Sequence, residues 1–260
     1  MEFDKDLTAR QEARELARRA ETAQRKLDEL SQRQLDAIVE AVAKAFAAQA
    51  SALAEMAVQE TGFGNAEDKT AKNLFASQRV AEAVRGMRTV GVLREVPEKK
   101  LWEIGVPVGV IAAIVPSTNP TSTVCYKAMI ALKSGNAIVF SPHPKAIACT
   151  RKAAQIVAEA AQAAGAPADA VACLSIPSLD GCQELMKAEP VRLILATGGP
   201  GMVKAAYSVS ARSPCRSRTP RSCRDAASDG YRPSSPARSR AGPPRSASRR
   251  ARPPAAGACP

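Results

Sequence analysis

Apolar side chains in the N-terminal third of the chain recur at helical spacing. One such set is Leu16, Ala20, Ala23, Leu27 and Leu30. Their spacing among Arg, Glu and Gln residues predicts an amphipathic helix over about residues 8–30. A second helix is expected from near Ser31, a candidate N-cap, to about residue 60, where Gly62 and Gly64 end it. With a third over about 67–85, these helices predict an N-terminal helical layer.

From Leu101 the pattern changes to short apolar runs. The stretch LWEIGVPVGVIAAIVP contains two β runs around a turn at residues 105–107, and the second run is typical of a strand buried on both faces. Further strands are expected over 137–140, 170–176 and 191–196, and helices over 121–133, 145–164, 179–188 and from 201. This alternation predicts right-handed crossovers and a doubly wound parallel sheet with four strands.

The composition changes again near Val209. Residues 209–260 hold 12 Arg, no Lys, 2 Asp and no Glu, and 41 of the 52 are Arg, Ser, Ala or Pro. Such a segment buries too little apolar surface to offset the entropy of ordering it, so it is predicted to be disordered. The expected fold class is therefore α/β: a helical segment over 1–98, an incomplete parallel sheet over 99–208, and a disordered tail over 209–260.

The net charge of +12 comes mainly from this tail, because residues 1–208 carry 25 basic and 23 acidic side chains. An Arg-rich tail can bind nucleic acid through phosphate contacts. This one has a single aromatic residue, Tyr231, and no regular Arg repeat, and its bias is also what GC-rich DNA yields when read out of frame. We therefore favour an accidental tail over a nucleic-acid-binding arm.

Targeting and cysteine signals are both weak. No run approaches the ~18 apolar residues of a membrane span, and the start of the chain lacks the apolar core of a secretory signal, so a cytoplasmic protein without membrane contact is expected. Cys125, Cys149, Cys173 and Cys182 lie singly, without CxxC spacing, in a chain with one histidine. Buried thiols are the favoured interpretation, ahead of disulfides or zinc, and no metal site is predicted.

Candidate chemistry lies in the loops that follow the predicted strands, because ligands bind at the carboxyl ends of parallel strands. These loops span residues 116–120, 141–144 and 197–201. The last, which holds Thr197, Gly198 and Gly199, leads from a strand into a helix, so its amides form either a phosphate cradle or only a tight turn.

Single polar residues in and around these loops leave alternatives open. Asn119, between two prolines, is suited to a rigid hydrogen bond to a substrate oxygen or to capping the next helix. His143 is either a contact for a cofactor hydroxyl or a plain loop residue. Three lysines that flank the loops are expected to be solvated charges rather than Schiff-base amines: Lys127, Lys133 and Lys145.

Several long motifs occur in an order that resembles the coenzyme A-acylating aldehyde dehydrogenases. They are ETGFG at 60–64 with EDK at 67–69 and KN at 72–73, GVPVGVIAAIVPSTNPTSTVCYKAMIALKSGNAIVFSPHP at 105–144, and LATGGPGMVKAAYS at 195–208. The resemblance covers about residues 10–208 and implies an aldehyde dehydrogenase-like Rossmann-type sheet. It also implies a reaction in which a cysteine thiolate attacks an aldehyde, hydride passes to NAD, and coenzyme A releases the acyl group as a thioester.

Site roles follow from the same resemblance. Asn119 matches the family's oxyanion-stabilising asparagine. Ser141 and His143 match the segment beside the adenosine ribose, whereas Thr197, Gly198 and Gly199 match the segment beside the pyrophosphate. NAD is the implied cofactor, coenzyme A and a small aldehyde are the implied substrates, and a homo-oligomer or association with an intact paralogue is the implied assembly.

The tail departs from the family pattern. The family's catalytic cysteine lies in a separate domain downstream of the Thr-Gly-Gly-Pro motif, and Cys215, Cys223 and Cys259 lack its surrounding motif. We therefore expect a truncated member without turnover of its own, and a frameshift near codon 208 is the simplest hypothesis for the tail. Two alternatives stay open: a nucleotide-binding platform with a basic nucleic-acid-binding tail, and a regulatory subunit of an intact paralogue.

Overall fold

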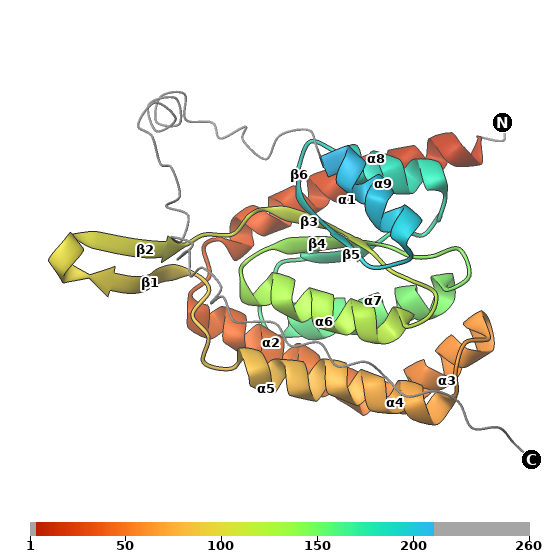
Figure 1. The fold of residues 1–260 in the computed structure, drawn as a ribbon, viewed down its shortest axis with the longest axis horizontal. Helices are drawn as coiled ribbons and strands as arrows, with labels where there is room; N and C mark the ends of the chain where they lie inside the picture. The colour runs from red at the N-terminus through yellow and green to blue at the C-terminus, as the bar shows by residue number, and fades with distance from the viewer. Residues whose placement is uncertain (1–3, 211–260) are drawn as a thin grey trace, which may run out of the picture. The chain divides into compact units, whose positions relative to one another are not determined.

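A four-stranded parallel sheet is the centre of this computed structural model, which describes residues 4–210 (Figure 1). Its order is β5-β4-β3-β6, and every neighbouring pair is parallel. The strands are β3 (Val110–Ile114), β4 (Ala137–Ser141), β5 (Val171–Cys173) and β6 (Val191–Ala196). The predicted α/β class and its four parallel strands are confirmed. The predicted start of the disordered tail at residue 209 is wrong, because the last helix extends to Ser210 and Val209 packs against buried apolar side chains. The rest of the tail prediction, with Cys215, Cys223 and Cys259, lies outside the described residues.

Helices cover both faces of the sheet (Figure 1). On one face lie α1 (Lys5–Leu27) and α8 (Leu179–Lys187), and on the other lie α6 (Pro120–Lys133) and α7 (Ile147–Ala163). The last helix, α9 (Pro200–Ser210), packs against β6 and α8. Every residue of β3 and β4 is buried, which is why β3 and the first four residues of β4 are continuously apolar.

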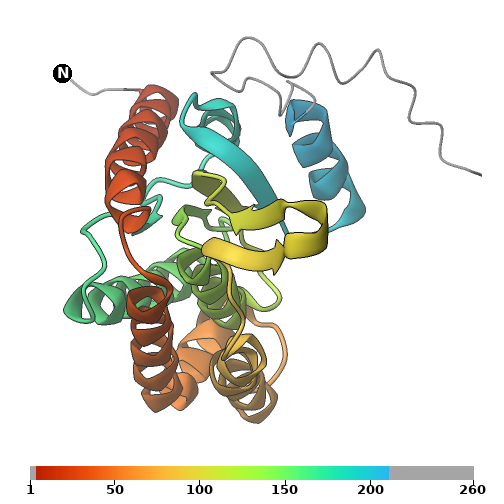
Figure 2. The ribbon, with the colours of Figure 1, turned by 90° about the vertical axis from the view of Figure 1, so that its left-hand side faces the viewer.

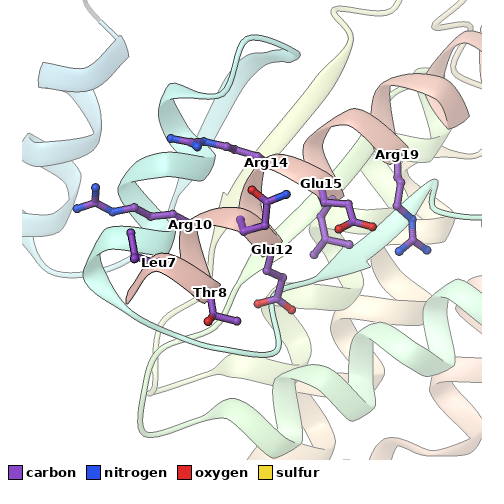
Figure 3. A pocket seen from close by; sticks show the side chains of 9 residues that line it. Leu7, Thr8, Arg10, Glu12, Arg14, Glu15 and Arg19 are labelled. Atoms are coloured by element: carbon purple, nitrogen blue, oxygen red, sulfur yellow. The ribbon is translucent and has the colours of Figure 1, made fainter. Parts of the chain in front are cut away.

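The first helix buries a stripe of small side chains against the sheet. The buried positions are Ala9, Ala13, Ala17, Ala20, Ala23 and Leu27. Beside this stripe, Arg14 Nε lies 2.6 Å from Glu184 of α8, and Glu12 accepts the amides of Ser175 and Ile176 at 2.7 and 3.0 Å (Figure 3). Because α1 shares its hydrophobic core with the sheet, it docks through this apolar stripe. The predicted domain boundary at 98/99 stays a prediction.

A further helical layer packs outside α6 and α7 (Figure 1). It comprises α2 (Gln32–Ala48), α3 (Ala50–Thr61), α4 (Ala66–Leu74), the π-helical turn η1 (Phe75–Arg79) and α5 (Val80–Val84). Ser31 forms the predicted N-cap within a capping box, and Gly62 ends α3 at a φ of 70°. The single helix expected from Ser31 to residue 60 is wrong, because the chain bends by 64° between α2 and α3 at Gln49, whose φ of −108° is not helical.

An antiparallel hairpin projects from the sheet layer, and Figure 2 views it from its tip. It pairs β1 (Gly91–Val96) with β2 (Leu101–Gly105) around the 3-10 turn η2 (Pro97–Lys99). The sequence predicted the β2 run but missed β1. Side chains on both faces of the hairpin are exposed, and Trp102 is 61% exposed. Because neither face is buried, the sequence of β1 does not need to alternate between apolar and polar residues.

Two lysines of α6 correct the prediction that all three flanking lysines are solvated. Lys133 is 3% exposed, and its Nζ lies 2.5 Å from an Asp36 carboxylate oxygen of α2. Lys127 is 2% exposed and donates to backbone carbonyls. Both lie on a helix packed between the sheet and α2, and an ammonium group that is buried there needs an internal hydrogen-bond acceptor. Lys145 is exposed, as predicted.

No single helix within residues 4–210 is long and apolar enough to cross a membrane. The bent pair α2 and α3 meets that length and composition jointly. The apolar faces of both helices pack into the hydrophobic core, with Phe46 and Leu53 each at most 2% exposed.

Candidate functional site

The three predicted loops surround one cavity of about 590 Å³ at the carboxyl ends of the strands. All six predicted site residues line it: Asn119, Ser141, His143, Thr197, Gly198 and Gly199. The sheet order explains this position. From β3 the chain moves outward through β4 to β5 and then crosses to β6 on the other side of β3, so the cavity lies at a topological switch point.

A second surface hollow, of about 700 Å³, runs along α1 (Figure 3). Arg10, Arg14 and Arg19 in its lining already pair with acidic residues. Of these two hollows, the switch-point cavity is the one that the predicted residues line.

Asn119 occupies the N-cap position of α6, but its side chain makes no capping hydrogen bond. Its backbone carbonyl accepts the Thr123 hydroxyl at 2.6 Å. Within residues 4–210 the half-buried Asn119 side chain has no hydrogen-bond partner, and it lines the cavity. Asn119 is thus the N-cap residue by position, as the capping alternative expected, but its side-chain amide does not cap the helix and is available to a ligand.

Lys69 of α4 supports the loop that carries Asn119. Its Nζ donates to the Thr118 carbonyl at 2.6 Å, and burial together with Lys72 lowers the pKa of Lys69. One turn later, Asn73 accepts the Thr121 hydroxyl at 2.8 Å and donates to the Ala50 carbonyl at 2.9 Å. Neither residue was predicted to have a role. The available signal was their spacing of one helical turn within the motifs that carry the family resemblance.

The last residue of β4 supplies a buried hydroxyl, and the loop after β4 supplies an exposed imidazole. Ser141 is 4% exposed, and its carbonyl accepts the Val115 amide at 3.0 Å. His143 accepts the Lys145 amide on Nδ1 at 3.1 Å, so Nε2 carries the proton of the neutral ring. The imidazole is thus oriented as a donor at the edge of the cavity.

Glu60, from the end of α3, caps the helix that follows this loop. Its carboxylate oxygens accept the amides of Ala148 and Cys149 in the first turn of α7 at 2.7 and 2.8 Å. Burial acts to raise the pKa of Glu60, but these hydrogen bonds and those from the Cys149 thiol and the Ile147 amide outweigh it and lower the pKa.

We expect Glu60→Gln to lower the free energy of unfolding by about 1 kcal/mol at neutral pH, as for other lost helix caps. Because folding lowers the pKa of Glu60, its contribution is complete above 4.5, the ordinary Glu value, and is lost as the pH falls through the lowered value. Urea unfolding across this pH range measures the difference. The exposed Glu29→Gln serves as the control, and equal behaviour of the two variants would contradict the cap.

The loop after β6 presents backbone amides to the cavity. The Tyr126 hydroxyl lies 3.3 Å from the Thr197 hydroxyl, and the Gly199 carbonyl accepts the Val203 amide in the first turn of α9. No atom lies within 4 Å of the position that a Cβ at Gly199 would occupy. This open backbone at a helix N-terminus suits an anion such as a phosphate.

None of the four cysteines in the described part of the chain is a thiolate at neutral pH. Burial raises the pKa of Cys125 and Cys182, and it raises the pKa of Cys149 and Cys173 to about 12. Cys125, Cys149 and Cys182 are buried as predicted, whereas Cys173 is half-buried. Residues 4–210 also hold no group of three or more His, Cys, Asp or Glu side chains that could bind a metal ion.

Comparison with known proteins gives matches over most of the chain. The profile of the aldehyde dehydrogenase family matches residues 5–217. The bifunctional aldehyde-alcohol dehydrogenase AdhE of Escherichia coli K12 is 49% identical over 193 residues, which are 74% of this chain and 22% of that protein. Succinate-semialdehyde dehydrogenase (acetylating) of Clostridium kluyveri is 38% identical over 195 residues, 75% of this chain and 43% of that protein.

Solved structures that are similar in fold also belong to aldehyde dehydrogenases. The crystal structure of an acetylating aldehyde dehydrogenase from Geobacillus thermoglucosidasius is similar with a TM-score of 0.78 and 52% identity, over 79% of this chain and 46% of that one. The chain thus spans less than half the length of each of these relatives. With the family profile, the sequence identity and the fold in agreement, this chain belongs to the aldehyde dehydrogenase family.

Proposed function

We propose that this chain supplies the dinucleotide-binding half-site of a coenzyme A-acylating aldehyde dehydrogenase, with NAD as its cofactor. The observation that carries the proposal is the convergence of all six predicted residues on one cavity at the switch point of the sheet. Relatives support it. A propionaldehyde dehydrogenase from Rhodopseudomonas palustris has been solved with bound CoA and an acylated cysteine, and an engineered glycolyl-CoA reductase has been solved with bound NADP⁺.

The residues present fit a dinucleotide. In the proposed arrangement the pyrophosphate is bound by the amides of Gly198 and Gly199, the N-terminus of α9 and the Thr197 hydroxyl, because these groups offer donors and a positive dipole end, and the backbone at Gly199 is open. The Ser141 hydroxyl and the His143 Nε2–H hydrogen-bond the adenosine ribose hydroxyls. Bound NAD supplies the hydride acceptor for aldehyde oxidation.

Asn119 is proposed to stabilise negative charge on the aldehyde oxygen. Its free side-chain amide can donate to that oxygen as a thiolate attacks the carbonyl carbon, and a donor of this kind lowers the barrier to attack. The four cysteines of residues 4–210 have raised pKa values, so none of them is proposed as that thiolate. We propose that this chain binds the dinucleotide but does not form acyl-CoA on its own. The proposed location is the cytoplasm, and the proposed assembly is a homo-oligomer or a complex with an intact paralogue.

Calorimetric titration of the 260-residue chain with NADH and with NADPH tests the proposal. We expect NADH to bind, and Gly199→Val to raise its Kd at least tenfold, about 1.4 kcal/mol, because the new side chain enters the phosphate cradle from open space. Gly201→Val makes the same change at an exposed glycine that does not line the cavity and should bind like the wild type. A wild-type chain that binds neither dinucleotide would refute the proposed function.

A further inference from the structure

Lys127 is a buried cation at the split between two strands. Its side chain extends from α6 and is 2% exposed. The Nζ donates to the carbonyl of Ile114, the last residue of β3, at 2.8 Å, and to the carbonyl of Leu195 in β6 at 2.7 Å. One ammonium group therefore bridges the carboxyl ends of both strands.

The bridge lies where β3 and β6 separate. Their parallel register ends at Ile114 and Ala196, and the next bond across this pair, from the Thr197 amide to the Ile114 carbonyl, is stretched to 3.4 Å. Val115 instead donates to the Ser141 carbonyl of β4 at 3.0 Å. Just past Ile114 the bond to β4 is therefore shorter than the bond to β6, and Lys127 joins β3 and β6 where their pairing weakens.

Packing alone does not account for a cation at this position. Within residues 4–210 Lys127 pairs with no carboxylate, unlike Lys133 on the same helix, which pairs with Asp36. Burial lowers the pKa of Lys127 to about 8, and no charged neighbour contributes to that change. A buried ammonium without a counter-charge opposes folding, whereas an apolar side chain would fill the same space at no such cost.

We propose that Lys127 is a positioning residue. It sets the spacing of β3 and β6 at the switch point, and thereby the spacing between the Asn119 loop and the loop of Thr197, Gly198 and Gly199. Each bridged residue lies two positions before its loop, so the loops inherit the separation of the strand ends. The inference rests on the proposed function, because it assigns the residue that holds the two sides of the dinucleotide site in register.

Lys127→Met tests the proposal, because it keeps an unbranched side chain and removes the donor. We expect about a tenfold rise in the Kd for NADH, and faster amide deuterium exchange in residues 114–119 and 195–199. Lys133→Met is the matched control: it removes the other buried lysine of α6, which does not line the cavity, and should leave the Kd and the exchange of both loops unchanged.

The pH dependence separates positioning from a purely structural role. The pKa of Lys127 is about 8 in the folded chain and ordinarily 10.5, so between these values the unfolded chain binds the extra proton and the stability linked to Lys127 rises with pH. Over the same range the ammonium loses its charge and its hydrogen bonds weaken. If Lys127 positions the two loops, the affinity for NADH falls as the pH rises through this range, although the free energy of unfolding rises. If its role is purely structural, the affinity for NADH rises together with the free energy of unfolding. Lys127→Met should lose both trends, and a pH dependence that persists in this variant comes from other groups near the loops, such as Lys69 or Cys182.

Each outcome decides the inference. Weaker NADH binding by Lys127→Met with the opposed pH trends supports it, and binding equal to that of the wild type overturns it. If the wild type binds neither NADH nor NADPH, the proposed function fails on its own. Deuterium exchange in the two loops then tests whether Lys127 holds the strand ends together. Faster exchange in Lys127→Met supports this role, and unchanged exchange overturns it.

Discussion

Replacing Phe140 with alanine is expected to lower the free energy of unfolding by about 3–5 kcal/mol. Phe140 is 0% exposed in β4, which lies between β3 and β5 and is covered on one face by α1 and on the other by α6. The substitution leaves a cavity that a strand hydrogen-bonded on both sides cannot close by moving. Chemical unfolding followed by circular dichroism measures the change.

Phe75→Ala provides the matched control. It makes the same chemical change at a side chain that is 64% exposed in η1 and should shift the free energy of unfolding by no more than about 0.5 kcal/mol. Similar losses in the two variants would mean that the sheet does not form the core of the folded chain.

Burial on two faces explains which strands could be predicted from the sequence. All five residues of β3 and all five of β4 are buried, so β3 and residues 137–140 of β4 form uninterrupted apolar runs. The hairpin strand β1 is exposed along most of its length, and Arg94 and Glu95 interrupt its apolar residues. Without a buried face there is no periodicity to detect, and β1 was missed for that reason.

The loops of the candidate site could be predicted, but the side chains that support them could not. In a parallel sheet the carboxyl ends of the strands lie at one edge, so strand positions alone placed Asn119, Ser141 and Thr197 near one another. The partners of Lys69 and Lys127 are backbone carbonyls, which every residue has and which carry no sequence signature. Both lysines therefore resemble surface charges until the tertiary structure shows where their ammonium groups lie.

The largest expected effect on activity is that of Asn119→Ala. The variant is best measured in a chimera in which residues 5–208 of this chain replace the matching part of the Geobacillus acetylating aldehyde dehydrogenase, which is 52% identical and similar with a TM-score of 0.78. Loss of one oxyanion donor is expected to lower kcat for NAD- and CoA-dependent aldehyde oxidation about 100- to 1000-fold, or ~3–4 kcal/mol in activation free energy. The Kd for NADH should change little, because the amide is proposed to contact the aldehyde oxygen and not the dinucleotide.

Thr118→Ala is the control within the same loop. Thr118 is exposed, and the loop is held through its backbone carbonyl, which accepts Lys69 and survives the substitution, so kcat should stay within about twofold of the unmodified chimera. A large loss in both variants would indicate that the loop conformation, rather than the Asn119 amide, determines the rate. An Asn119→Ala chimera as active as its parent would contradict the oxyanion role. A loss of activity cannot come from a lost helix cap, because the Asn119 side chain makes no capping bond.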